Sequence, residues 1–114
     1  MRRGEVWWAE LPAPAGRRPV ILLSRDEAYA VRELVTVAPV TTRVRRIPSE
    51  VPLGSEDGLP RRCVVNLDTI TTVPKRVLSG LIASLSPAKV AEVDRAIWFA
   101  LGLRPTASPA NTPP

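Results

Sequence analysis

The sequence predicts a mainly β (α+β) domain, in which a small, strongly curved barrel or sheet carries one C-terminal helix packed on it. Short apolar runs rich in Val and Thr recur before residue 86, separated by turns that contain Pro, Gly or charged residues. A single helical pattern follows, from Ser86 to Leu101. A length of 114 residues with 45% apolar content suits one domain with one core and excludes a wholly disordered chain.

Seven segments are expected to be strands, namely Glu5–Leu11, Pro19–Ser24, Leu34–Thr42, Glu50–Leu53, Arg62–Leu67, Thr69–Val73 and Leu78–Leu85. The first is an apolar and aromatic run that ends where Pro12, Pro14 and Gly16 indicate a loop. The second contains the compact apolar run Val20–Leu23, which is typical of a buried strand. A turn or short helix is expected over Arg25–Ala30, before the third strand begins.

The third strand is rich in Val and Thr, which favour strands, but it contains Pro39. Proline cannot donate to a strand ladder, so we expect an edge, a bulge or a strand end there. The basic loop Arg43–Arg46 follows, and a polar turn over Gly54–Pro60 separates the fourth strand from the fifth. Asp68 separates the fifth from the sixth, and one helical turn is expected over Pro74–Val77. Alternation in the last strand predicts a shared face for three apolar residues, Leu81, Ala83 and Leu85.

The helix has clear start and stop signals. Ser86 is a good N-cap, Pro87 suits the first helical position, and Gly102 marks the end. Its apolar stripe consists of Val90, Val93, Ile97 and Leu101. We therefore expect a folded domain over residues 1–103. The remaining residues, 104–114, hold four prolines among the last ten and are expected to form a disordered tail.

The charge pattern indicates an anionic partner. The net charge is +5, and fourteen of the sixteen cationic side chains are arginine, which forms bidentate contacts to phosphate and stacks on bases. Nucleic acid is the favoured partner, with a merely solvated basic surface as the alternative. No apolar run of eighteen residues exists, so no transmembrane helix and no membrane partner are expected. The basic start, Met1-Arg2-Arg3, lacks the apolar stretch of a signal peptide.

The residue types also limit the chemistry. The absence of histidine excludes histidine acid–base catalysis, His–zinc sites and Ser-His-Asp triads. The acidic pairs Asp26-Glu27 and Glu56-Asp57 are sequence neighbours in turns, so we expect no metal site and no cofactor. Cys63 lies in an apolar strand and is expected to be a buried structural thiol. A single cysteine also agrees with a reducing, cytoplasmic location.

Two short segments combine arginine with hydroxyl groups. Arg17-Arg18-Pro19 stands where a loop enters the second strand, and Thr41-Thr42-Arg43 stands where the third strand ends. If these strands pair, an arginine and a threonine meet at one rim, where they could hold a phosphodiester. The alternative is that they are exposed solvated arginines and ordinary strand threonines.

The tryptophans leave two interpretations open. Trp7 and Trp8 are adjacent in a strand and should face opposite sides, so that one is core and the other could stack bases or cover an interface. Trp98 flanks the apolar stripe of the helix. It is either a core residue or part of a dimer interface.

Together these segments resemble the MazF/PemK family of toxin endoribonucleases from toxin–antitoxin systems. The resemblance spans about residues 2–103 and rests on the order of five pieces: Arg3-Gly4-Glu5-Val6-Trp7, Arg18-Pro19-Val20-Ile21-Leu22-Leu23-Ser24, Val37-Ala38-Pro39-Val40-Thr41-Thr42, Val64-Val65-Asn66-Leu67-Asp68-Thr69-Ile70 and the final helix with Leu101-Gly102-Leu103. It implies an SH3-like small β-barrel with a C-terminal helix, and a homodimer. It also implies metal-independent cleavage of single-stranded RNA at short sequences, leaving a 2′,3′-cyclic phosphate and a 5′ hydroxyl.

The resemblance places the family's motif arginine at Arg18 and its motif threonine at Thr41, as catalytic residues. Neighbouring residues are expected to contact RNA, namely Arg17, Thr42, Arg43, Arg45 and Arg46. The family also implies a cognate antitoxin with a disordered, acidic and apolar segment that covers the RNA site. The loop Pro12–Arg17 is shorter than in many relatives, where it gates the RNA groove.

Two other functions remain open at this point. One is a nucleic-acid-binding barrel without catalytic activity, since SH3-like barrels often bind RNA without cutting it. The other is a toxin of the gyrase-poison type, which shares the fold. The combination of Arg18 with Thr41 favours the endoribonuclease. Arginine is a poor general base because its side chain stays protonated, and no other residue stands out for that role.

Overall fold

The computed structural model describes residues 1–103, and the expected disordered tail lies outside them. The strands are β1 (Glu5–Glu10), β2 (Arg17–Leu22), β3 (Leu34–Thr41), β4 (Glu50–Leu53), β5 (Cys63–Asn66), β6 (Thr71–Pro74) and β7 (Leu78–Ser84). The α-helices are α1 (Ala28–Val31) and α2 (Pro87–Ala100), and three 3₁₀ turns are η1 (Ser55–Asp57), η2 (Leu67–Thr69) and η3 (Lys75–Val77). The expected strands, the short helix and the terminal helix are therefore confirmed within one or two residues at most ends.

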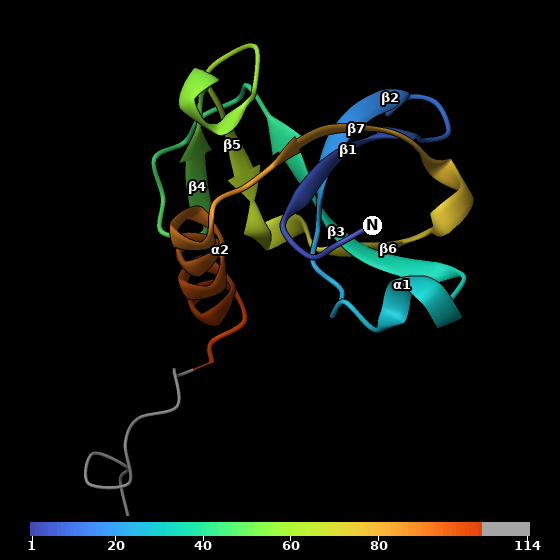
Figure 1. The fold of residues 1–114 in the computed structure, drawn as a ribbon. Coiled ribbons are helices and arrows are strands. Elements are labelled where there is room, and N and C mark those ends of the chain that lie inside the picture. Colours follow the sequence, from blue (N-terminus) through green and yellow to red (C-terminus); the bar gives the residue numbers. More distant parts are fainter. Residues whose placement is uncertain (104–114) are drawn as a thin grey trace, which may run out of the picture.

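All the strands form one antiparallel sheet in the order β4-β5-β3-β2-β1-β7, and β6 pairs with β3. Figure 1 shows the sheet curling round, so that β1, β2 and β7 arch over one side of the molecule and β3 with β6 lies across from them. α2 lies beside β4, at the other end of the molecule from α1. The predicted mainly β fold, a small curved barrel with a C-terminal helix, is confirmed.

β3 is the central strand, and Pro39 marks the point where its partner changes. Along one edge β3 pairs with β2, and Pro39 lies opposite Val20. Along the other edge it pairs first with β6, up to Val37, and then with β5, from Val40. Pro39 thus lies between the two partner strands, where its missing N–H interrupts no ladder on that side. The sequence predicted an edge, a bulge or a strand end at Pro39, whereas the structure shows a change of partner within a central strand.

Two buried clusters form because β2 is covered on both faces. Ile21 belongs to a cluster with Leu67 and Val93, which joins the sheet to α2. Its neighbour Leu22 belongs to a second cluster with Val37 inside the curl. Successive side chains of a strand point to opposite faces, so the continuous apolar run of β2 serves both cores.

The register of β7 differs from the simple alternation expected for it. β1 lies opposite β7 with a shift between Val6, which faces Ala83, and Trp7, which faces Leu81. The shift skips Ile82, which packs against the first cluster, while Leu81 is 54% exposed. Leu81 therefore does not share a face with Ala83 and Leu85 as the alternation predicted, because the register shift interrupts that alternation.

The final helix begins and ends as its sequence indicates. The Ser86 hydroxyl accepts a hydrogen bond from the Lys89 N–H at 3.1 Å, and Gly102 adopts a left-handed φ of +69° after the last turn. Leu101 is exposed instead of continuing the apolar stripe, because α2 ends at Ala100. Within residues 1–103, no helix is long and apolar enough to cross a membrane.

The start of the chain packs closely against α2 at Gly4. Its N–H donates to the Leu22 carbonyl at 2.9 Å, and its carbonyl accepts from the Leu85 N–H at 3.1 Å. Its φ is +92°, and a Cβ here would lie 2.7 Å from Cγ2 of Val90. Val is stiff at χ1 in a helix, so this neighbour cannot easily move aside.

We expect Gly4→Ala to destabilise the fold both by backbone strain at a positive φ and by a clash with Val90. Gly102→Ala should cause the backbone strain alone. Gly102 has the same left-handed requirement, but nothing lies within 4 Å of its virtual Cβ. Gly102→Ala should lower the free energy of unfolding by about 1–2 kcal/mol, and Gly4→Ala by about 1–3 kcal/mol more because of overpacking. Urea denaturation of both variants measures the difference. Equal losses would contradict a tight contact with Val90.

Candidate active site

The pairing of β2 with β3 brings Arg18 and Thr41 together. Val20 lies opposite Pro39 in the antiparallel register, and the same register extended by two residues sets Arg18 opposite Thr41. Both residues lie at the ends of their strands, on the same face as the second core cluster. The sequence suggested this meeting only if the two strands pair, and they do.

The Arg18 guanidinium is held by the loop that precedes it. Its Nε donates a hydrogen bond to the Ala15 carbonyl at 2.7 Å. The loop itself is closed by a hydrogen bond from the Leu11 N–H to the Gly16 carbonyl at 3.0 Å. No ion pair joins Arg18 to a carboxylate of residues 1–103. A guanidinium has five N–H donors, so four remain for an anion such as a phosphate.

The Thr41 hydroxyl is oriented by the chain that follows it. Thr41 Oγ1 accepts a hydrogen bond from the Arg43 N–H at 3.1 Å. Because that contact uses only a lone pair of Oγ1, the hydroxyl group can still donate a hydrogen bond to an oxygen of a bound group. Arg18 and Thr41 thus offer several donors at one rim.

Two adjoining hollows meet at this pair. The first, here called the tryptophan pocket, has a volume of about 390 Å³ and is lined by Trp8, Arg18, Pro19, Val40, Thr41, Thr42, Leu59, Pro60, Arg61, Cys63 and Ile82. The second, here called the arginine groove, has a volume of about 330 Å³ and is lined by Leu11, Ala15, Arg18, Val20, Pro39, Val40, Thr41, Arg43, Arg45, Asn66 and Thr69. Arg18, Val40 and Thr41 line both, so the pair stands at their junction.

Two of the cations that line the arginine groove come from the loop Arg43–Arg46, which was expected to be basic. Arg43 and Arg45 both line the groove, whereas Arg46 does not. The backbone of the loop is fixed by Glu50, whose Oε1 accepts the N–H of Arg45 at 2.9 Å and of Arg46 at 3.0 Å. Arg46 takes a left-handed φ of 57° there. The carboxylate of Glu50 thus orders a loop that carries three arginines, without neutralising Arg43.

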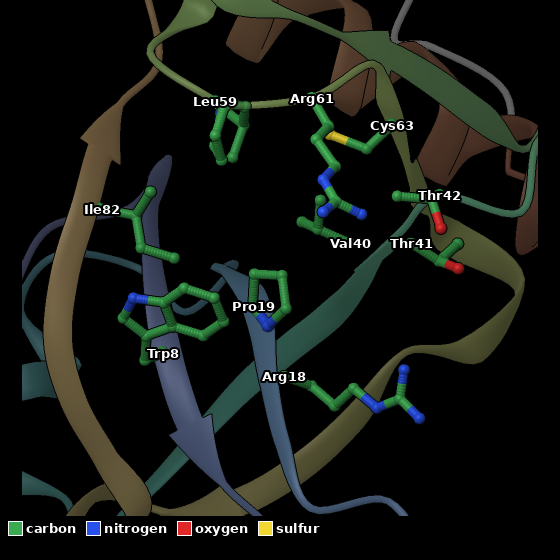
Figure 2. A pocket seen from close by; sticks show the side chains of 11 residues that line it. Trp8, Arg18, Pro19, Val40, Thr41, Thr42, Leu59, Arg61, Cys63 and Ile82 are labelled. Carbon is green, nitrogen blue, oxygen red and sulfur yellow. The ribbon is translucent and has the colours of Figure 1, made fainter.

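Arg17 and Thr42 take different positions. The Arg17 guanidinium stacks 4.3 Å from the centroid of the Trp8 ring and lies 3.4 Å from Glu10. Arg17 lines neither hollow, although its side chain is 58% exposed. Thr42 lines the tryptophan pocket beside Thr41 (Figure 2). The expected RNA contact of Arg17 stays a prediction, and its ion pair with Glu10 competes with it.

Sequence reasoning missed Arg61, Asn66 and Thr69, which also line the hollows. The β3–β5 register sets Thr41 opposite Val64, so the residues just before β5 follow the end of β3. Arg61 therefore lies near the chain that leaves β3, and Figure 2 shows its side chain reaching toward Val40. The available signal was the Arg61-Arg62 pair directly before an apolar strand.

Cys63 is buried, and no carboxylate of residues 1–103 lines either hollow. The Cys63 thiol is buried, and burial, with the nearby Asp57 carboxylate, raises its pKa, so it stays protonated at neutral pH. Among residues 1–103, no three Cys, Asp or Glu side chains converge as metal ligands would. The polar groups that line the two hollows are mainly arginine guanidinium groups and threonine hydroxyls.

Trp98 lies on α2 and is half-buried, while its neighbour Phe99 is 60% exposed. Leu101 and Leu103 follow with exposures of 58% and 54%. The exposed apolar surface at this end of the chain is thus formed mainly by the residues after Trp98.

Comparison with known proteins gives one consistent result. The chain is 42% identical over 100 residues to probable endoribonuclease MazF5 of Mycobacterium tuberculosis (strain ATCC 25618 / H37Rv), which covers 87% of this chain and 91% of the relative. It is 40% identical over 104 residues to probable endoribonuclease MazF2 of M. tuberculosis (strain CDC 1551 / Oshkosh), covering 90% and 99%.

Solved structures agree in fold. The M. tuberculosis toxin MazF-mt6 superposes with a TM-score of 0.81 at 33% identity, covering 88% of this chain and 98% of that one. An endoribonuclease in complex with its cognate antitoxin, from a mycobacterial species, gives a TM-score of 0.82 at 28% identity, covering 93% and 99%. The model of the family described as PemK-like, MazF-like toxin of type II toxin–antitoxin system matches residues 2–101. The chain therefore belongs to this family of toxins.

Proposed function

We propose that this chain is a MazF-type endoribonuclease toxin that cleaves single-stranded RNA, without a metal, at a phosphodiester bound between Arg18 and Thr41. The observation that carries the proposal is the meeting of these two residues at the junction of the tryptophan pocket and the arginine groove. A chain that runs through both hollows must pass the pair. The curated relatives, named as probable endoribonucleases, support the same activity.

The substrate supplies its own nucleophile in this mechanism. The ribose 2′ oxygen attacks the adjacent phosphorus, an O2′–P bond forms, and the P–O5′ bond breaks. The proton lost by the 2′ hydroxyl passes to a base, and the leaving 5′ oxygen gains one proton. The products are a 2′,3′-cyclic phosphate and a 5′ hydroxyl.

The two residues act on the charge that develops during this step. Arg18 donates to the non-bridging oxygens, whose negative charge grows in the transition state. Thr41 donates a hydrogen bond from its hydroxyl group to one of the same oxygens. Both side chains are already held by backbone contacts, to the Ala15 carbonyl and from the Arg43 N–H, so little reorganisation is needed when the substrate binds.

The same surface suits the control of the toxin by a cognate antitoxin. One structural neighbour is an endoribonuclease in complex with its antitoxin. An acidic and apolar segment of such a partner would match the arginine groove and the apolar pocket beside it, so it would cover the pair. Ordering such a segment costs free energy, which favours a long contact.

The assembly is a homodimer, and it works in the cytoplasm. Exposed apolar side chains on and after α2, namely Phe99, Leu101 and Leu103, support an interface that also contains Trp98. An RNA substrate and the free thiol of Cys63 support a reducing compartment.

Arg18→Ala should lower the rate of RNA cleavage by about 10²–10³-fold, the usual effect of losing one donor to a developing charge. Stability should change little, because the guanidinium is exposed. The rate is measured on a long single-stranded RNA in excess chelator, with end analysis of the products. Arg76→Ala is the matched control, because Arg76 is exposed and lines neither hollow. Wild-type cleavage that stops in chelator would contradict the metal-free mechanism, and full activity of Arg18→Ala would contradict the site.

Replacing Arg43 and Arg45 by alanine should weaken the salt dependence of RNA binding. Each phosphate contact on single strands contributes a slope of about −0.7 in log K against log salt, so the double variant should flatten the slope by about 1.4. Binding is measured with RNA that carries 2′-deoxyribose at the mapped cut positions. The control, Arg32→Ala with Arg76→Ala, removes the same charge outside both hollows. Equal slopes for the two double variants would place the groove arginines away from phosphates.

Sedimentation of the purified chain at micromolar concentration should give twice the monomer mass of 12.4 kDa. Phe99→Glu should shift the chain toward monomer, because it places a charge on an apolar interface. Leu34→Glu is the control, since Leu34 is also exposed but lies at the start of β3. A wild-type mass near that of one chain would refute the dimer.

A further inference from the structure

The tryptophan pocket has the size and walls of a site for one flat, mostly apolar group. Its volume is about 390 Å³, within the usual range for small-ligand sites, and apolar surface predominates in its lining. Trp8, Leu59 and Ile82 form the apolar walls (Figure 2). The cation–π contact with Arg17 steadies the Trp8 ring, because the guanidinium stacks on it.

Arg61 is the charged group of this hollow that the arginine groove does not share. Its side chain reaches from the segment before β5 toward Val40, in the direction of Thr41 and Thr42 (Figure 2). No carboxylate of residues 1–103 forms an ion pair with it. A guanidinium presents parallel N–H donors and no acceptor, so it selects a group with two adjacent acceptors.

The position of the pocket limits what can occupy it during cleavage. It shares Arg18 and Thr41 with the arginine groove, so a group in the pocket is attached next to the phosphate held by that pair. In a single-stranded RNA, that group is the base of a nucleotide that flanks the scissile bond. Splayed bases of this kind are commonly stacked on aromatic rings and read along their edges.

We propose that the tryptophan pocket binds one base beside the scissile phosphate, and that Arg61 selects guanine or cytosine there. Guanine offers O6 and N7 as neighbouring acceptors, which is the common partner of an arginine fork. Cytosine offers O2 and N3. Along their Watson–Crick edges, adenine and uracil place a donor next to each acceptor. Adenine does the same along its Hoogsteen edge. These edges therefore cannot accept both N–H groups of the Arg61 fork.

A base fits the pocket better than an apolar antitoxin side chain does. A base combines a flat apolar body for the walls, an acceptor edge for Arg61 and a phosphate attached within reach of Arg18. An aliphatic or aromatic side chain provides only the first, and offers the Arg61 guanidinium no pair of acceptors. The inference rests on the proposed function, because it assigns a base to that same site.

The test is to map cleavage of an RNA pool that is randomised around the cut site, for matched variants. The wild type should prefer G or C at one position adjacent to the cut. In Arg61→Ala and Arg61→Lys this preference should fall by about 5- to 150-fold, the range of one bidentate contact, while other positions keep their preferences. Arg61→Lys keeps the charge but loses the fork. Arg62→Ala is the control, because it removes the same charge one residue away and outside the pocket.

Trp8 provides an independent check on the wall of the pocket. Two RNAs are compared, both made uncleavable by 2′-deoxyribose at the cut site. One carries the preferred base in the pocket position, and the other has an abasic site there. Trp8→Phe should weaken binding of the first RNA more than binding of the second. Trp7→Phe is the control, because Trp7 packs against the second core cluster and hydrogen-bonds Glu5 at 2.9 Å. Thermal unfolding of each variant verifies that the fold is retained.

Three outcomes would overturn the inference. The base preference could be unchanged in both Arg61 variants, or Arg62→Ala could relax it equally, which would indicate general electrostatics. The Arg61 and Trp8 variants could also cleave normally but escape inhibition by the antitoxin, which would assign the pocket to that protein. A wild type that cleaves no RNA would refute the proposed function instead. Base-dependent affinities for the blocked RNA would then still test the pocket on its own.

Discussion

The antiparallel pairing of β2 with β3 is the constraint on which the site and both cores depend. Ile21 faces Ala38 in this register, and both are fully buried in the cluster that joins the sheet to α2. A slip of one residue would exchange the two faces of β2 and place Leu22 against α2. The cores therefore fix the register firmly. The same register, extended by two residues, sets Arg18 opposite Thr41. The geometry of the site therefore depends on the packing of the two cores.

The site is ordered mainly by hydrogen bonds between side chains and nearby backbone. Arg18 binds the Ala15 carbonyl, Thr41 accepts from Arg43, and Glu50 holds the loop of Arg45. These contacts are made during folding, so the conformational cost of arranging the donors is met before the substrate arrives. Arginine suits such a site because its fork is planar and always charged. A lysine at residue 18 would lack the Nε that faces Ala15.

The division of the surface into two hollows separates two tasks. The arginine groove presents Arg43 and Arg45, whose charges attract any phosphate backbone regardless of sequence. The tryptophan pocket is mostly apolar and carries Arg61 in addition to the shared Arg18, so it suits contacts that depend on the base. Because Arg18 belongs to both, affinity for the backbone and choice of base act on the same scissile bond.

The sequence by itself determined the secondary structure, the helix caps and the candidate pair. Apolar runs, turn residues and the Ser86-Pro87 start are local signals, and they were sufficient for the strands and for α2. The motif order added the family and named Arg18 with Thr41. Those inferences needed no knowledge of which strands are neighbours in space.

Only the tertiary structure decided which side chains share a hollow. Arg61 joins the site because β5 pairs with β3 across more than twenty residues of sequence, and no local pattern reports such a pairing. The exposure of Leu81 follows from a bulge against β1, and the place of Pro39 from a change of partner. Local sequence sets the conformation of a segment, whereas the register between distant strands depends on how the whole core packs.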